Sequence, residues 1–369
     1  MDNSGKQKIK FMVGAKVLRA KLKASSRVVG SGIVPILDNF LFLISGESLT
    51  VVSSDLETTI STSVVITNTD GSGSVAVPAK RLMDLLSVCG DASLTFSISG
   101  TTMKINTGSG TYSVECMGAQ DFPDVPSVEG NSVTINAEDL LYGINNTMFC
   151  VANDPFRPIM SGICISVSPI MTRFAATDAH RMSECVVLSE STATDQFVIP
   201  TKAARNIAAM LDGRTGPVSI VFNDKNVEVM LPDTLIVCLR TEGKFPNYRG
   251  LLEMDLPIKV EVNLASFLEV TKRISVVSPM MNRFASLKFK SDKTLIVSAR
   301  DIDFGVAGEE TLECNSATEC FINLKVDFLL EVLSHLSGDT VTFAMRDEKT
   351  ACSLYTDDKN KTLLMPMVV

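Results

Sequence analysis

Asp178 and His180 are the two residues in this sequence whose types and spacing come nearest to an acid–base pair, since they flank one alanine in the stretch TDAHR. A carboxylate beside an imidazole can transfer protons, but no third member or nucleophile is evident in the sequence. A structural or partner-binding role is therefore favoured over a hydrolase that uses this pair. The other histidine, His335, stands beside Leu333 and Leu336 on an expected helix and is interpreted as structural.

The glycine-rich stretch GSGSVA, residues 71–76, resembles a phosphate-binding loop only loosely. It lacks the Lys-Ser/Thr pair that completes such a loop, so a hairpin turn is the better interpretation. We therefore expect no catalytic site, no cofactor and no metal.

Cations at helical spacing are the stronger chemical signal. Lys16, Arg19, Lys23 and Arg27 are spaced 3, 4 and 4 residues apart in a helix expected over residues 15–29, which places them on one stripe. Leu18, Leu22 and Val29 lie around another face, where they would enter a core. One side of this helix is therefore suited to an anion.

Cations recur at the starts or outer faces of later expected helices, at Lys80, Arg81, Lys202, Arg205, Lys272, Arg273 and Lys325. Each helix alone could be an ordinary solvated face. The recurrence favours phosphates as the anions, because scattered Lys and Arg contact a nucleic-acid backbone without reading base edges. No zinc finger, RNP motif or tryptophan is found, so sequence-specific recognition is not indicated.

The sequence repeats itself at a nearly constant interval. Asp55, Asp178 and Asp301 each lie between β-type runs and are 123 residues apart, and Phe122 and Phe245 keep the same step. Each Asp stretch is followed by a strand that runs into a helix. This order indicates three tandem domains, with boundaries at 1–127, 128–253 and 254–369. Within each we expect two helices and about eight strands, an α+β fold in which antiparallel sheets cover the helix pair.

Composition fits a globular protein, with 45% hydrophobic and 21% charged residues. The net charge is -8, yet residues 6–27 hold eight Lys or Arg and no acid, so a basic patch lies on an acidic body. Nine cysteines without a C-x-x-C pair indicate reduced thiols. No apolar run is long enough for a signal-peptide core or a membrane span, and we expect a cytoplasmic protein.

These motifs, from KFMVGAKVL through TDAHR and KFPNYRG to the terminal LMPMVV, resemble the family of bacterial DNA polymerase III beta subunits, the sliding clamps. The resemblance implies a head-to-tail homodimer that forms a six-domain ring. Helices would line the hole around double-stranded DNA, and strands would form the outer wall. It also implies a non-enzymatic processivity factor that tethers the replicative polymerase, the clamp loader, other polymerases and mismatch-repair proteins through linear peptides.

The resemblance implies two further sets of site residues. The client peptide would enter an apolar cleft formed by Met160, Thr177, His180, Arg181, Met182, Pro246, Leu251, Leu363, Met365, Pro366 and Met367. Flexible thioethers suit such a surface because they repack around different side chains. Across the dimer interface, Tyr112 and Val114 of one copy would meet Val276 and Val277 of the other, although an internal core role remains open for each.

The chain departs from the family pattern at two places. Pro158 and Ile159 follow Arg157 where an aromatic pair is expected, which puts a DNA or gating role of this loop in doubt. Ala179 stands where glycine is common. A repeat-built interaction scaffold that does not encircle DNA remains the alternative function.

Overall fold

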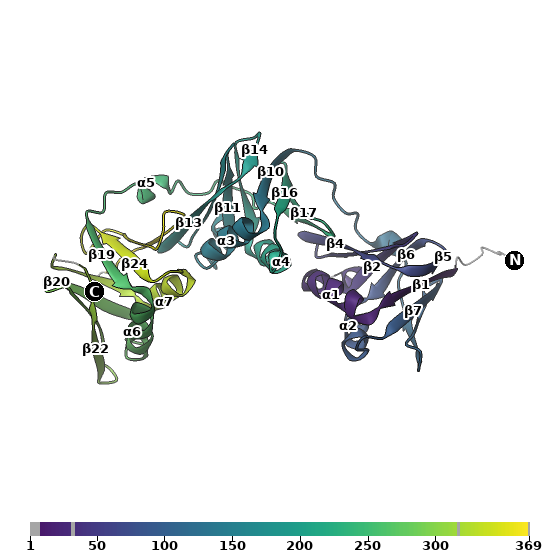
Figure 1. The fold of residues 1–369 in the computed structure, drawn as a ribbon, viewed down its shortest axis with the longest axis horizontal. Coiled ribbons are helices and arrows are strands. Elements are labelled where there is room, and N and C mark those ends of the chain that lie inside the picture. The colour runs from purple at the N-terminus through teal and green to yellow at the C-terminus, as the bar shows by residue number, and fades with distance from the viewer. Residues whose placement is uncertain (1–7, 31–33, 316–317, 368–369) are drawn as a thin grey trace. The chain divides into compact units, whose positions relative to one another are not determined.

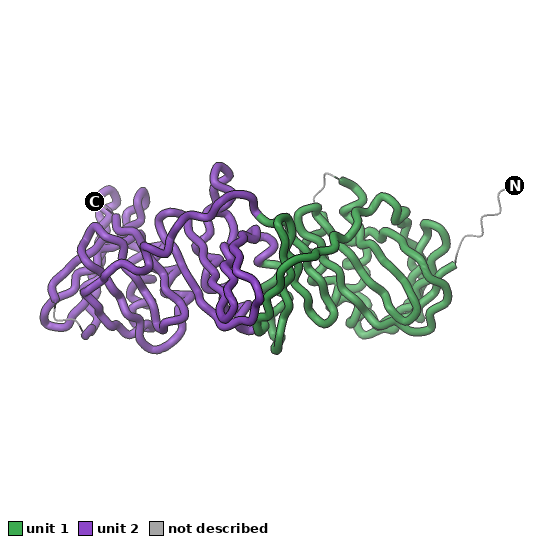
Figure 2. Tube along the Cα trace, turned by 90° about the horizontal axis from the view of Figure 1, so that it is seen from above, with its two compact units in different colours: residues 1–137, 205–240 green, residues 138–204, 241–369 purple. Residues whose placement is uncertain are grey.

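The computed structural model describes residues 8–30, 34–315 and 318–367 of the chain (Figure 1). By internal contacts it divides into one unit of residues 1–137 and 205–240 and a second unit of residues 138–204 and 241–369 (Figure 2). These units do not coincide with the three predicted domains, because two of the sheets continue across the predicted boundaries. The boundaries at 1–127, 128–253 and 254–369 therefore stay a prediction.

The first repeat contains two helices and nine strands among its described residues, one strand more than predicted. The helices are α1 (Ala15–Ser25) and α2 (Ala79–Val88). The strands are β1 (Lys8–Gly14), β2 (Asn39–Ser45), β3 (Ser48–Ser54), β4 (Thr58–Val65), β5 (Thr67–Asp70), β6 (Gly73–Pro78), β7 (Ser93–Ser99), β8 (Thr102–Asn106) and β9 (Thr111–Glu115).

The core of the first repeat follows from the sequence periods. Ile9, Phe11 and Val13 alternate along β1 and are buried, and the ring of Phe11 stacks on Phe96 with centroids 4.8 Å apart. Leu18 and Leu22 are buried on α1, which packs beside α2 (Figure 1). The helix predicted over residues 15–29 is shorter, because α1 ends at Ser25 and a 3₁₀ turn continues from Ser26 to Val28.

The second repeat carries α3 (Ala137–Met148), α4 (Thr201–Leu211) and the one-turn helix α5 (Arg249–Leu252). Its strands are β10 (Asn131–Asn136), β11 (Gly162–Val167), β12 (Met171–Thr177), β13 (Arg181–Leu188), β14 (Glu190–Ser191), β15 (Asp195–Pro200), β16 (Pro217–Phe222), β17 (Asn226–Leu231) and β18 (Thr234–Leu239).

The third repeat carries α6 (Leu264–Val276) and α7 (Val326–His335), which pack on each other. Its strands are β19 (Ile258–Asn263), β20 (Phe284–Lys290), β21 (Thr294–Asp301), β22 (Val306–Glu313), β23 (Cys320–Lys325), β24 (Thr340–Met345), β25 (Cys352–Tyr355) and β26 (Asn360–Leu364). Phe267, Phe289 and Phe343 are fully buried in its core.

Antiparallel pairing joins neighbouring repeats edge to edge. In the first unit, β4 pairs with β18, and the strands that this unit contributes to their sheet are ordered β10-β16-β17-β18-β4-β3-β2-β6. In the second unit, β13 pairs with β26 in a sheet ordered β15-β11-β12-β13-β26-β25-β24-β19. The remaining two sheets, β5-β1-β7-β8-β9 and β22-β21-β20-β23, keep β9 and β22 as outer strands.

The recurring aspartate closes the same turn in each repeat. One carboxylate oxygen of Asp55, Asp178 and Asp301 accepts the backbone N–H groups two and three residues later, at 2.6–3.2 Å. A short side chain that bonds its own downstream backbone makes an Asx turn, for which Asp and Asn are the suited residues. Leu56 and Ala179, which follow the first two of these acids, have positive φ of 73° and 75°. This geometry explains why glycine would fit at position 179.

Candidate functional site

An apolar cavity of about 390 Å³ opens in the second unit. Its walls come from the 3₁₀ turn at Pro158–Met160, the β12–β13 turn, the segment before α5 and the chain after β26. The lining residues are Arg157, Met160, Thr177, Ala179, His180, Arg181, Met182, Pro246, Asn247, Tyr248, Leu251, Ala351, Leu363 and Met365. Such a hollow, mostly apolar with a few polar groups at its edge, suits an apolar ligand segment.

The structure brings together nine of the eleven residues that the resemblance implies for a peptide cleft. Pro366 and Met367 do not line the cavity, and the Met367 N–H instead donates to the carbonyl of Asn323 at 2.8 Å. Arg157, Ala179, Asn247, Tyr248 and Ala351 line it and were missed. Asn247 and Tyr248 directly follow Pro246 in KFPNYRG, so the signal for these two was adjacency to a predicted residue.

Local hydrogen bonds fix the β12–β13 turn at the rim of the cavity. The Thr177 hydroxyl accepts the Ala179 N–H at 3.1 Å and donates to the carbonyl of Arg181 at 2.8 Å. The Met365 N–H donates to the carbonyl of His180 at 2.8 Å, which ties the C-terminal chain to the turn. Two walls of the cavity are therefore held at a fixed separation by backbone bonds.

Arg181 is a cation at this rim whose side chain is largely covered, with only 9% of it exposed. Its Nε donates to Asp178 at 3.0 Å and its Nη1 donates to Glu331 of α7. The guanidinium also lies 4.4 Å from the ring centroid of Phe328. Burial lowers the pKa of Arg181, but the hydrogen bond to Glu331 and the nearby carboxylates outweigh it, so the pKa is raised and the side chain stays charged.

Asp178 and His180 do not form an acid–base pair in the described structure. The Asp178 carboxylate accepts the backbone N–H of His180 at 2.9 Å, and the same carboxylate also pairs with Arg181. The imidazole of His180 stacks instead on Phe328, with centroids 6.4 Å apart. The geometry uses Asp178 to shape the turn and leaves His180 as an exposed aromatic edge of the cavity.

The loop around Arg157 lacks the aromatic pair that the family pattern places after the arginine. Arg157 pairs with Asp154 at 2.7 Å, and hydrogen bonds from Arg157 and the Phe156 N–H hold the pKa of Asp154 below its usual value. The Phe156 side chain is 94% exposed. An aromatic ring is therefore present, but it precedes the arginine.

The four cations predicted on α1 and its continuation are all exposed: Lys16, Arg19, Lys23 and Arg27. Lys80, Arg81, Lys202 and Arg205 are exposed as well. Lys16 also lies 3.7 Å from Asp91 on the surface, a distance at which an ion pair contributes little.

Acids and an aromatic ring already contact the predicted cations of the third repeat. Lys272 lies 3.3 Å from Glu269, and Arg273 makes two hydrogen bonds of 2.7 and 2.8 Å to Glu310 of β22. The ammonium of Lys325 lies 4.5 Å from the ring centroid of Phe328. A phosphate would have to compete with these contacts, which the spacing of cations along the sequence did not indicate.

The residues predicted at a dimer interface lie on or beside the two outer strands. Tyr112 on β9 is 48% exposed and Val276 at the end of α6 is 80% exposed, so neither is a core residue. Val114 and Val277 are half-buried and pack partly against their own cores. Outer strands present unpaired N–H and C=O groups that another chain can complete.

Three properties of the described residues bear on other classes of site. No three His, Cys, Asp or Glu side chains converge as metal ligands within the described ranges. The described helices include none long and apolar enough to cross a membrane. All nine cysteines are free, and burial raises the pKa of Cys164 and Cys238 to about 12.

Three family models match the chain in tandem. They are the N-terminal domain of the DNA polymerase III beta subunit at residues 9–126, its central domain at residues 134–247 and its C-terminal domain at residues 251–368. The beta sliding clamp of Haemophilus influenzae is 23% identical over 90% of this chain and 92% of its own length. The beta sliding clamp of Pseudomonas aeruginosa is 25% identical over the same shares.

Solved structures share the fold at full length. The sliding clamp of Pseudomonas aeruginosa bound to griselimycin superposes with a TM-score of 0.94 at 23% identity, covering 98% of this chain and 100% of that one. The clamp of Bacillus subtilis gives a TM-score of 0.92 at 20% identity, covering 98% and 99%. The three repeats of this chain thus have the architecture of the matched clamps.

Proposed function

Because the chain belongs to the DNA polymerase III beta subunit family and is a DNA sliding clamp, we propose that two copies join head to tail into a closed ring around duplex DNA. Three similar domains from each of two chains give six similar steps, and closed cyclic symmetry needs complementary ends. The outer strands β9 and β22 supply such ends. The observation that carries the proposal is the tandem match of all three clamp domains over residues 9–126, 134–247 and 251–368.

The exposed cations of α1, α2 and α4 face the DNA backbone in this proposal. Lys and Arg contacts to phosphates are sequence-independent and weaken with salt, which suits a ring that must slide. Retention comes from enclosure, so no single contact has to be strong. The third repeat contributes less to the contacts with DNA phosphates, because Lys272 and Arg273 already pair with acids.

The apolar cavity bordered by Met182, Tyr248 and Leu363 is the site at which clients are held. A short linear peptide with apolar side chains suits the size and the apolar lining of this cavity. The chain tethers a replicative polymerase and its loader through such peptides and carries no catalytic activity of its own. A cytoplasmic location follows from this role in replication.

Retention on DNA tests the proposal. We expect the protein, once assembled on nicked circular DNA by a clamp loader, to co-elute with that DNA and to be lost after one restriction enzyme linearises it. Circular DNA without the restriction site, treated with the same enzyme, is the matched control. A scaffold that does not encircle DNA would behave identically on circular and linear DNA, and that result would remove the ring.

A further inference from the structure

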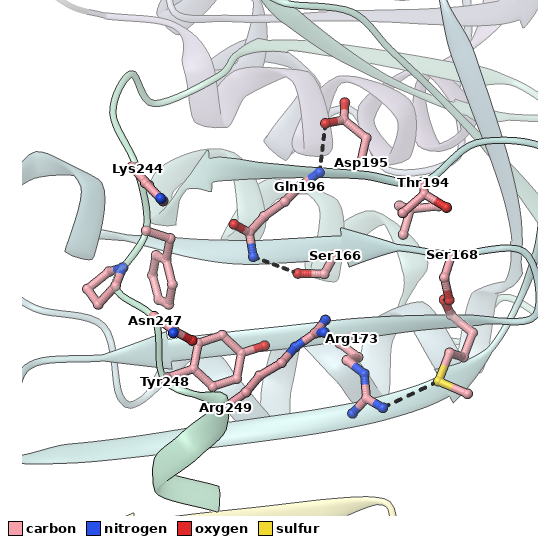
Figure 3. A pocket seen from close by; sticks show the side chains of 14 residues that line it. Ser166, Ser168, Arg173, Thr194, Asp195, Gln196, Lys244, Asn247, Tyr248 and Arg249 are labelled. Atoms are coloured by element: carbon pink, nitrogen blue, oxygen red, sulfur yellow. Dashed lines mark hydrogen bonds between the residues drawn. The ribbon is translucent and has the colours of Figure 1, made fainter.

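A second cavity, of about 680 Å³, lies next to the apolar cleft in the second unit. Its floor is formed by β11, β12 and β15, and its rim by the segment of residues 244–249 (Figure 3). Pro246, Asn247 and Tyr248 line both cavities. This segment therefore forms a ridge with one face toward the apolar cleft and the other toward the second cavity, which we call the polar pocket.

The polar pocket differs chemically from the cleft. Three cations line it, Arg173, Lys244 and Arg249, against one carboxylate, Asp195 (Figure 3). Gln196 and Ser166 of neighbouring strands are also part of it and share a hydrogen bond of 2.9 Å. The lining thus mixes polar with apolar side chains, is more polar than that of the cleft, and carries an excess of positive charge.

One of these cations is already neutralised. Arg173 donates to Glu184 at 3.1 Å, and the second oxygen of Glu184 accepts the Tyr248 hydroxyl at 3.0 Å. Burial, together with the nearby Glu184, raises the pKa of Tyr248, so the phenol remains a donor. Lys244 and Arg249 are exposed, and neither forms an ion pair with another of the described residues. Their two charges are available to a ligand.

We propose that the polar pocket binds acidic residues that flank the apolar motif of a client peptide, with Lys244 and Arg249 as the cations that hold them. This inference rests on the proposed use of the apolar cleft by clients. A chain that leaves the cleft across the ridge at Pro246 enters the polar pocket directly, because the same three residues border both. The protein carries a net charge of -8, so most of its surface repels an acidic segment, whereas these two cations attract it. The pocket would therefore orient the peptide and select among clients.

The test uses three fluorescein-labelled peptides that share one core with leucine and phenylalanine side chains. The first carries neutral Gly-Ser extensions at both ends, the second carries Asp-Glu residues on the N-terminal side, and the third carries them on the C-terminal side. Fluorescence anisotropy measures each Kd on the full-length protein. We expect one acidic peptide to bind about three- to tenfold more tightly than the neutral one, as two partly solvated ion pairs allow. The gain should shrink as salt is raised.

Two double variants with the same charge change separate the pocket from general electrostatics. In Lys244→Gln/Arg249→Gln the gain should fall to less than twofold, while the neutral peptide keeps its wild-type Kd. In the control Lys225→Gln/Lys288→Gln, which changes two exposed lysines outside the pocket, the gain should persist.

Three results would overturn the inference. If the neutral peptide binds but neither acidic extension improves Kd, the pocket does not recognise acids. If the gain survives in Lys244→Gln/Arg249→Gln, the acids bind elsewhere. If the neutral peptide itself does not bind, the proposed use of the cleft fails, and this inference fails with it.

Discussion

Arg181 and Arg157 border the same cleft, and each pairs with an aspartate three residues earlier, but their surroundings differ. The Arg181 side chain is 9% exposed and also contacts Glu331 and Phe328, whereas the Arg157 side chain is 49% exposed. Removing one member of a buried charged network leaves its partners unpaired. We expect Arg181→Ala to lower the free energy of unfolding by about 2–3 kcal/mol, and Arg157→Ala to change it by less than about 0.5 kcal/mol.

Urea titration followed by circular dichroism checks this pair. Equal effects of the two substitutions on the free energy of unfolding would show that the low exposure of Arg181 does not make its contacts more stabilising than those of Arg157. The sequence predicted Arg181 at the cleft by resemblance, but not its partner in α7, because Glu331 is 150 residues away and only the tertiary fold brings the two together. For the same reason, the bonds from Arg273 to Glu310 were not predicted from the positions of the cations along α6.

At the scale of elements, the sequence predicted what each repeat contains but not how the repeats join. The period of 123 residues identified the three copies, the two longer helices of each and the position of the recurring aspartate, since these depend on local pattern, whereas the one-turn helix α5 was not predicted. The pairings β4–β18 and β13–β26 depend on which strand edges meet in three dimensions. The internal repeat gives no information about which strand edges meet. The sequence also did not predict the ninth strand of the first and second repeats.

The β17–β18 turn provides a test of one such joint. Asp233 in this turn accepts hydrogen bonds from Lys21 of α1 and from Arg214, the latter at 2.8 Å. Burial raises the pKa of Asp233, but the two donors lower it by more than burial raises it, so the pKa lies below its usual 3.8. Because the pKa is lowered in the folded state, the ionised carboxylate stabilises the protein at pH values above the unfolded-state pKa. This stabilisation is lost as the pH falls through the folded-state pKa.

We therefore expect Asp233→Asn to cost about 1 kcal/mol at pH 6, the sum of two partly exposed ion pairs. The difference from wild type should shrink as pH is lowered below 3.8, where the wild-type carboxyl protonates. Urea midpoints measured from pH 6 downward report this directly, with Asp224→Asn, at an exposed position in the preceding β16–β17 turn, as the control. A cost that is independent of pH would show that charge at Asp233 is not what holds the joint.

At the scale of the whole molecule, closure of the proposed ring depends on the contact between the outer strand β9 of one copy and the outer strand β22 of the other. Val276 is 80% exposed in one chain, so a contact with a second copy at this helix end would bury an apolar side chain that the single chain leaves in water. Placing a charge there forces an unpaired carboxylate into the contact, and this opposes association far more than it disturbs the fold. We expect Val276→Asp to convert a particle of twice the chain mass into a monomer at micromolar concentration, with an unchanged circular dichroism spectrum.

Leu188→Asp is the matched control, since Leu188 is 78% exposed on β13, in a sheet that contains neither β9 nor β22. Size-exclusion chromatography with light scattering should give the dimer mass for this variant and the monomer mass for Val276→Asp. A dimer that survives Val276→Asp would place the contact on other strands, while a wild-type monomer would remove the closed ring altogether. Because enclosure of DNA requires closure, the monomeric variant should also lose retention on nicked circular DNA even though every cation of α1 is still present.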